Sequence, residues 1–188
     1  MGTVYQIAGD DIREEMEYVM EKYHQPLFDA GVSIDLLKAL SGEEDDPTPL
    51  RHHGYAAAAL VRICSLKDRV KGCKDAEIVI DGANCDMWSV DELRAILDHE
   101  LTHLELQFDS DGKLKRDDID RPKLKMRLHD RQFGWFDIVA NRWGNDSVEV
   151  QQAKSIMQDW EFVQMYLPGF DHALIGSDRP LLQGVDAQ

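Results

Sequence analysis

A helix that begins at Ser89 is the most strongly specified element in the sequence. The segment WSVDEL carries Ser89 and, three residues later, Glu92, the pair that forms a capping box at a helix N-terminus. Trp88 and Leu93 stand at the two positions of the hydrophobic staple, which fixes the entry of the chain into the first turn. We therefore predict a helix that starts here and carries the stretch LDHELTHLEL, residues 97–106.

The side chains of this helix divide into two faces. Each residue advances by about 100°, so residues four apart lie on the same side. His99 and His103 consequently project together, with Ile96 beside them and Glu100 displaced around the cylinder. A neighbouring apolar stripe is predicted to pack against a sheet, and it comprises Leu93, Leu97, Leu101, Leu104 and Phe108. The histidine face is left for a cleft.

This H-E-x-x-H pattern has the geometry for two imidazole ligands on one zinc ion. Glu100 could then approach a zinc-bound water as a general base without binding the metal itself. The pattern arises by chance at roughly the per cent level, so it needs support from the rest of the chain. A catalytic zinc also keeps three protein ligands, which requires a third residue.

The candidates for a third ligand are the other histidines and a downstream carboxylate. We favour His129, because helical spacing predicts a helix over residues 129–143 with His129 in its first turn, on the inward face that Phe133, Phe136, Ala140 and Trp143 continue. A histidine in that place needs a partner, so a hydrogen-bonded core histidine is the alternative. The weaker candidates are His24, His52, His53 and His172.

The remaining patterns predict an α+β domain. Helical spacing predicts helices over residues 11–23 and 147–167, and short apolar or alternating stretches predict strands over 32–40, 56–64 and 76–81. The expected order is a helix, three strands and three helices in a single domain of residues 1–188. Because no periodic pattern follows Phe170, we expect residues 171–188 to form a poorly ordered tail.

Charge and composition exclude several classes of protein. The net charge of −15 argues against a nucleic-acid partner, which would need a basic face. The basic stretch at 113–127 is interrupted by aspartates, so we predict a solvated loop there. No segment approaches the ~20 apolar residues of a membrane span, and no secretory signal is visible. Three cysteines without a C-x-x-C pair indicate free thiols, as in a cytoplasmic protein.

The sequence resembles the metallopeptidase domain found in phage and prophage genomes. DHELTHLEL at 98–106 and HDRQF at 129–133 carry the likeness, together with HGYAAAALVRICSLKDR at 53–69 and DAEIVID at 75–81. It covers a core of residues 53–143, with the first and last helices outside it. More remotely, the chain is similar to the SprT-like zincins, although it lacks the cysteine zinc ribbon of their DNA-repair members.

The resemblance implies a zincin-like α+β fold, with a small three-stranded sheet packed against the active-site helix and further helices. It implies a Zn²⁺ site of His99, His103 and His129, with Glu100 as catalytic base in the hydrolysis of a protein or peptide substrate of unknown identity. A phage origin would place the protein in the host cytoplasm. Asp98 departs from the pattern, since zinc peptidases often have an uncharged residue there, and we expect it to point away from the ligands.

Several roles stay open. A non-catalytic zinc domain that acts as a protein-interaction module is the alternative function, and coincidental histidines on a helix are a third interpretation. Arg142, Tyr55 and His53 are conceivable oxyanion stabilisers, though surface or packing roles are favoured for each. Residues 76–81 could line the cleft and pair with an extended substrate, or form an interior strand. Asp130 could orient a ligand histidine, or be an acidic residue favoured in the first turn of a helix.

Overall fold

The computed structural model describes residues 2–42, 49–52, 54–130 and 134–166, with side chains described as far as residue 157. The chain forms two compact units, residues 1–151 and 152–188. The single domain expected over residues 1–188 stays a prediction. The expected tail at 171–188 lies outside the described residues, as do His53 and His172.

The centre of the first unit is a four-stranded mixed sheet, where three strands were expected. Its order is β1 (Val4–Ile7), β2 (Ile34–Leu40), β6 (Ala76–Asp81) and β5 (Ala59–Ile63). The β2–β6 pair is parallel and the other two pairs are antiparallel. Strand β1 was not predicted, because all four of its residues are exposed and it carries no alternation of buried and exposed side chains.

Residues 76–81 form an interior strand, because β6 is paired on both sides. They cannot accept an extended peptide along an edge, so that suggestion was wrong, and the edge strand of this half of the sheet is β5. The predicted strand at 56–64 begins only at Ala59. It is preceded by a two-stranded hairpin of β3 (Arg51–His52) and β4 (Tyr55–Ala56).

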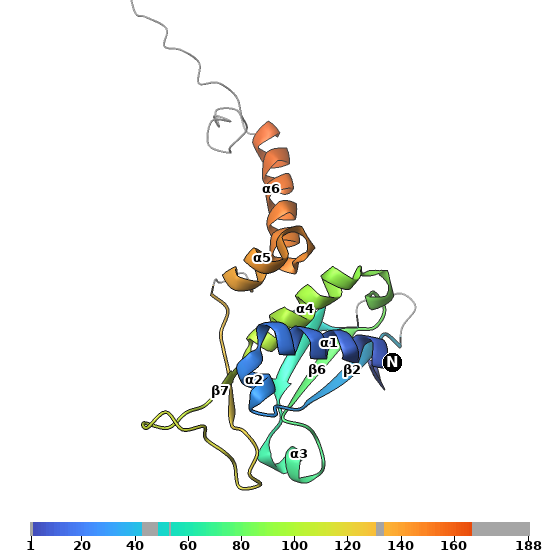
Figure 1. Ribbon diagram of the computed structural model, residues 1–188. Helices are drawn as coiled ribbons and strands as arrows, with labels where there is room; N and C mark the ends of the chain where they lie inside the picture. The colour runs from blue at the N-terminus through green and yellow to red at the C-terminus, as the bar shows by residue number, and fades with distance from the viewer. Residues whose placement is uncertain (1, 43–48, 53, 131–133, 167–188) are drawn as a thin grey trace, which may run out of the picture. The chain divides into compact units, whose positions relative to one another are not determined.

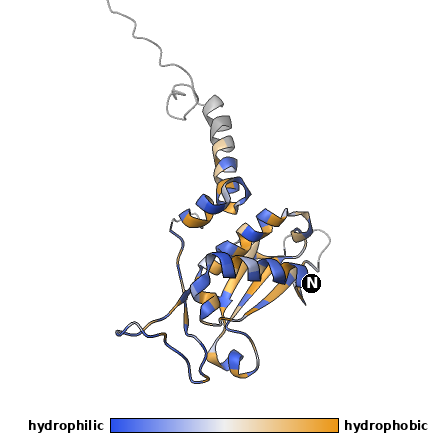
Figure 2. Ribbon diagram, in the orientation of Figure 1, coloured by the Kyte–Doolittle hydropathy of each residue, from blue (hydrophilic) through white to orange (hydrophobic). Residues whose placement is uncertain are grey.

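Helices α1 (Asp10–Tyr23) and α4 (Val90–Thr102) lie side by side over the sheet, with α2 (Gln25–Asp29) following α1 (Figure 1). The hydrophobic colour is concentrated on the strands beneath them (Figure 2). Val19 of α1, Leu36 of β2, Ile78 of β6 and Leu97 of α4 belong to one buried cluster. This apolar core fixes one side of α4.

Leu97 and Leu101 of the predicted stripe are fully buried in this core, and Leu93 packs against it. The helix is shorter than predicted, because it ends at Thr102; Leu104 lies in a strand, and Phe108 is 51% exposed and outside the helix. The histidine side is directed away from the core.

An arm of irregular chain leaves the end of α4 and returns to it. Its base is the antiparallel pair β7 (Leu104–Leu106) and β8 (Leu124–Met126), with isolated bridges at Phe108–Leu114 and Arg116–Pro122. The stretch at 113–127 is therefore more than a solvated loop. Arg69, in the short helix α3 (Leu66–Val70), is 5% exposed and lies 2.9 Å from the carboxylate of Asp117, which anchors the arm to the body.

The helix predicted over 129–143 is shorter than expected. Its described part is α5 (Asp137–Trp143), and His129 lies in an irregular segment that follows β8. Gly134 has φ +71, a left-handed conformation that interrupts a right-handed helix. A 3-10 turn at Gly144–Asp146 then leads into α6 (Val148–Tyr166), which matches the helix expected at 147–167.

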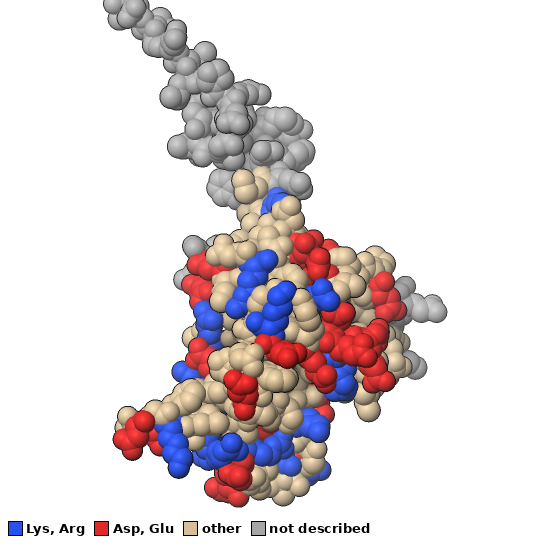
Figure 3. Space-filling view, viewed as in Figure 1, with Lys and Arg blue, Asp and Glu red and all other residues tan. Residues whose placement is uncertain are grey.

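The surface carries charges of both signs. Acidic and basic side chains are interspersed over the face shown in Figure 3. Among the described residues, no helix is long and apolar enough to cross a bilayer. All three cysteines are free thiols, as predicted.

Candidate metal centre

Helix α4 begins where the capping box predicts. The backbone N–H of Ser89 donates to the Glu92 carboxylate at 2.8 Å, and the N–H of Glu92 donates to the Ser89 hydroxyl at 3.2 Å. The helix then carries His99 and Glu100, and His103 stands at its C-cap. The start and the length of the helix together set both histidines on the side away from the core.

Three histidines converge beyond this helix. One ring nitrogen from each of His99, His103 and His129 lies within 4.8 Å of the others, and the Nε2 atoms of His99 and His129 are 3.2 Å apart. The structure thus brings together the three histidines that the sequence analysis selected, although His129 reaches them from an irregular segment rather than from a helix. Three imidazoles so close can hold one metal ion.

The outer nitrogens of two rings are held by other groups. Nδ1 of His99 lies 2.8 Å from Oε1 of Glu149, and Nδ1 of His103 lies 2.8 Å from the carbonyl oxygen of Arg127. Because a carboxylate and a carbonyl both accept hydrogen bonds, each Nδ1 carries the proton. The Nε2 atom of each neutral ring therefore keeps a lone pair for the cluster centre.

The electrostatics of the three rings differ. Burial lowers the pKa of His103 to about 4, and repulsion from the protonated forms of His99 and His129 lowers it further. Burial also lowers the pKa of His129. For His99, burial opposes the charged form, but the hydrogen bond to Glu149 and the charge of Glu100 outweigh it and raise the pKa. His103 and His129 are accordingly neutral at pH 7, the form that binds a metal ion.

Glu100 is buried beside this cluster. Burial, with the nearby charge of Glu149, raises its pKa to about 7, although His99 and a hydrogen bond from the backbone N–H of Val61 in β5 oppose the shift. A carboxyl group with a pKa near the working pH can both accept and return a proton.

The segment that carries His129 is fixed by local contacts. Asp130 accepts hydrogen bonds from Arg127 at 2.6 Å and from the backbone N–H of Asp137 at 3.1 Å, the first residue of α5. Phe136 is fully buried, and its ring centroid lies 4.8–4.9 Å from those of all three histidines. Asp130 thus ties the segment together and has no described contact with a ligand histidine, while Phe136 closes one side of the cluster.

Asp98 is the centre of a second buried cluster. Its carboxylate is fully buried and accepts hydrogen bonds from His24 at 2.6 Å, Arg142 at 2.7 Å and Trp143 at 2.8 Å. Burial would raise its pKa, but the hydrogen bonds from His24 and its other partners win, and the pKa is lowered. Asp98 does point away from the ligand face, as expected, and it joins α4 to α5 and to the end of α1.

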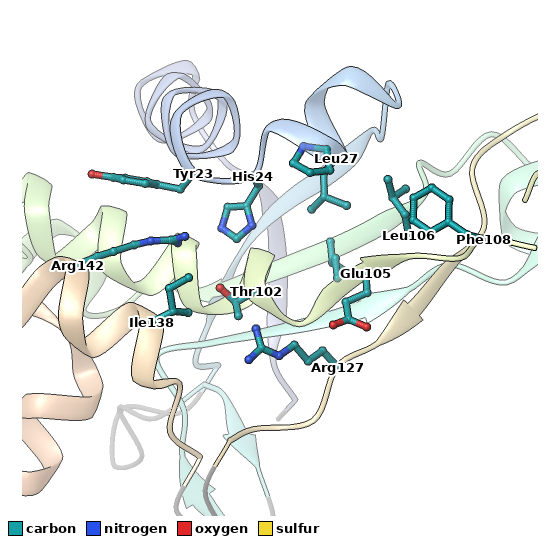
Figure 4. A pocket seen from close by; sticks show the side chains of 12 residues that line it. Tyr23, His24, Leu27, Thr102, Glu105, Leu106, Phe108, Arg127, Ile138 and Arg142 are labelled. Atoms are coloured by element: carbon teal, nitrogen blue, oxygen red, sulfur yellow. The ribbon is translucent and has the colours of Figure 1, made fainter. Parts of the chain in front are cut away.

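The weaker candidates that the structure describes lie outside the three-histidine group. His24 and Arg142 are hydrogen-bonded to Asp98. Both also line a pocket of about 370 Å³, whose walls include none of His99, Glu100, His103 and His129 (Figure 4). His52 lies exposed on β3, outside the group that could hold a metal ion. Tyr55 is 80% exposed on the β3–β4 hairpin.

Glu149 is the residue that sequence reasoning missed. It lies in the first turn of α6, where an acidic residue is ordinary because of the helix dipole, so no signal distinguished it. Its Oε2 atom is buried and has no hydrogen-bond partner among the described residues. A buried anionic oxygen without a donor is unfavourable unless positive charge lies nearby. The three histidines and this carboxylate together fit a bound cation.

One comparison with known proteins gives a match. A family model with the description "Putative phage metallopeptidase" matches residues 7–161. This range is wider than the expected core of 53–143, since it takes in α1 and most of α6. No curated protein and no solved structure matches the chain.

Proposed function

The chain belongs to the phage metallopeptidase family, and on this premise we propose that it is a zinc-dependent peptidase with Glu100 as its general base. The observation that carries the proposal is the convergence of three imidazoles beside a buried glutamate. The glutamate and His99 lie on one capped helix, His103 is at its C-cap, and His129 comes from the segment after β8. A structural zinc site is usually closed by four protein ligands, whereas a catalytic site keeps a position open. Three histidines, with the glutamate held apart from them, match the catalytic arrangement.

Zinc is the metal that suits these ligands best. Neutral imidazole is a preferred zinc ligand, and Zn–N distances of ~2.0–2.1 Å put the nitrogens of a tetrahedral site roughly 3.3 Å apart. The Nε2 atoms of His99 and His129 are already 3.2 Å apart. When bound by these residues, zinc would supply a Lewis acid that polarises a peptide carbonyl and makes water more acidic.

Glu100 would move the proton. Its carboxylate is next in sequence to His99 and shares the histidine side of α4, so it can take a proton from the attacking water and return it to the leaving amine. The hydrogen bond from the Val61 N–H fixes the carboxylate in place. Its raised pKa of about 7 suits a group that must do both.

Strand β5 is the edge where we place an extended substrate. The N–H of Asp81 donates to the carbonyl of Ala58, and the N–H of Cys64 donates to the carbonyl of Asp75. Pairing alternates along antiparallel strands, so the backbone groups of the odd-numbered residues of β5 face away from β6. These are Ala59, Val61 and Ile63. Because the Val61 N–H is taken by Glu100, a peptide could pair with Ala59 and Ile63 along this edge and so reach Glu100, over a short stretch because β8 also lies close to β5.

A single substitution tests the mechanism. Zinc-loaded wild type is expected to cleave casein or a proteome-derived peptide library, with products identified by mass spectrometry. Glu100→Gln should abolish cleavage while it keeps the fold and the zinc. Asp91→Asn, an exposed substitution in the first turn of the same helix, should leave cleavage unchanged.

Two outcomes would refute the proposal. Full cleavage by Glu100→Gln would show that Glu100 is not the general base. A zinc-loaded wild type that cleaves neither probe, but unfolds when zinc is removed, would favour the non-catalytic interaction module instead.

A further inference from the structure

Glu149 is held in place by more than one contact. Ser147 caps the start of α6, since its hydroxyl accepts a hydrogen bond from the N–H of Val150 at 3.2 Å. Gln151, in the first turn of α6, donates a hydrogen bond from its side-chain amide to the carboxylate of Glu92 at 3.0 Å. The first turn of α6 therefore contacts α4 at two places, and its position does not depend on the Glu149–His99 hydrogen bond alone.

The Glu149 carboxylate is committed to His99. It is 1% exposed, Oε1 accepts the proton of His99 Nδ1 at 2.8 Å, and Oε2 has no donor among the described residues. A buried carboxylate oxygen without a hydrogen-bond donor is unfavourable unless a cation lies nearby. The geometry is that of a carboxylate–histidine–metal arrangement, in which the carboxylate acts on the metal only through the ring.

We propose that Glu149 is a positioning residue of the metal site, an inference that rests on the proposed zinc function. Its carboxylate holds His99 in the form that offers Nε2 to the metal, fixes the orientation of the ring and makes the imidazole a stronger donor. The first turn of α6 is thus part of the metal centre, although it contributes no ligand.

The other ligands show why this role belongs to Glu149. His103 has a backbone carbonyl as its Nδ1 partner, which no side-chain substitution can remove. Asp130, the neighbour of His129, is engaged by Arg127 and by the N–H of Asp137. Among the described contacts, His99 is the only one of the three histidines whose Nδ1 is hydrogen-bonded to a carboxylate. The affinity of the site for a metal ion can therefore be changed through Glu149.

The experiment is zinc affinity, measured by competition with a chromophoric chelator. Glu149→Gln keeps the shape and can still accept the hydrogen bond but removes the charge, whereas Glu149→Ala removes both. We expect the zinc dissociation constant to rise about 10-fold for Gln and toward about 100-fold for Ala. Glu15→Gln breaks an ion pair with Arg94 far from the histidines and should bind zinc like wild type.

A second measurement separates positioning from packing. Circular dichroism of the metal-free proteins shows that each variant is folded, and ¹⁵N spectra of the zinc-loaded proteins report the His99 tautomer. We expect a protonated Nδ1 in wild type and in Glu149→Gln, with a shifted His99 signal in Glu149→Ala.

The outcomes are distinct from those for the proposed function. A folded Glu149→Gln that binds zinc within twofold of wild type would overturn the role of Glu149 and leave the peptidase proposal intact. If folded wild type binds no zinc at all, both proposals fall. Loss of cleavage in Glu100→Gln with normal zinc binding would support the peptidase without bearing on Glu149.

Discussion

The Nδ1 atom of His103 lies 2.8 Å from the carbonyl oxygen of Arg127, so the end of helix α4 is hydrogen-bonded to the segment that carries His129. This contact needs no metal ion. It brings a ligand from an irregular segment to within reach of two ligands on a helix, and Phe136 packs against all three rings. The three-histidine group is preorganised by the protein, which would favour tight metal binding because little ordering remains to be done.

His129→Ala should lose most of the bound zinc while the protein stays folded, because two imidazoles remain where three are needed. The measurement is metal content by mass spectrometry after dialysis, beside circular dichroism. His52→Ala is the matched control, since His52 is exposed and lies outside the three-histidine group. It should keep about one zinc per chain. Equal zinc content in the two variants would show that the third ligand is a residue other than His129.

Asp98→Ala should destabilise the protein by about 2 kcal/mol or more, because it leaves the half-buried donors of Arg142, Trp143 and His24 without their acceptor. The measurement is urea unfolding of the metal-free protein. Asp86→Ala removes an aspartate that is 84% exposed and pairs with Lys38, and it should leave the unfolding midpoint unchanged. A loss below about 1 kcal/mol for Asp98→Ala would show that the cluster contributes little.

The sequence contained the parts of the site that local patterns encode. The capping box from Ser89 to Glu92 and the four-residue spacing of His99 and His103 are local, and both were confirmed. The structure also places the ring of His129 beside theirs, whereas its role as a ligand stays a prediction. The helical periodicity behind that prediction was misleading, since Gly134 interrupts the helix. His129 faces the other two histidines even though its backbone is irregular.

The contacts that the sequence concealed are all long-range. Asp98 is adjacent to a ligand, yet its partners come from residues 24, 142 and 143, and no local pattern joins them. Glu149 reaches His99 from a helix fifty positions along the chain. Strand β1 has no buried face, so its place at the edge of the sheet depends on pairing with β2 alone. Strand pairing and the partners of buried charged side chains depend on tertiary structure, so local sequence patterns do not predict them.

Gly134→Ala should weaken zinc binding through backbone strain. Gly134 has φ +71, which costs an alanine about 1–2 kcal/mol, while its added Cβ would meet only the His129 ring at an ordinary 3.7 Å. Gly112→Ala is matched, because Gly112 has φ +77 with open space around it in the distant arm. Both variants should lose similar stability in urea, but only Gly134→Ala should lose zinc affinity. Equal affinities would show that the His129 segment tolerates the change.

Glu100→Gln should change the pH dependence of stability in the metal-free protein. Burial raises the pKa of Glu100 to about 7 from the 4.5 of an unfolded chain, so between these values the folded state holds a proton that the unfolded state has lost. The free energy of unfolding contributed by this group therefore falls as pH rises from 4.5 to 7. The loss is up to about 3 kcal/mol, and it is complete above pH ~7.

The comparison of wild type with Glu100→Gln isolates this contribution, because most other groups, His103 included, titrate in both proteins. Urea unfolding at pH 4.5 and pH 8, with chelator present, should show that wild type loses more stability over this interval than the variant does. Parallel pH profiles would mean that Glu100 is ionised at little cost in the folded protein. The carboxylate would then be solvated or paired in solution, and the proton transfer proposed for it would lack its matched pKa.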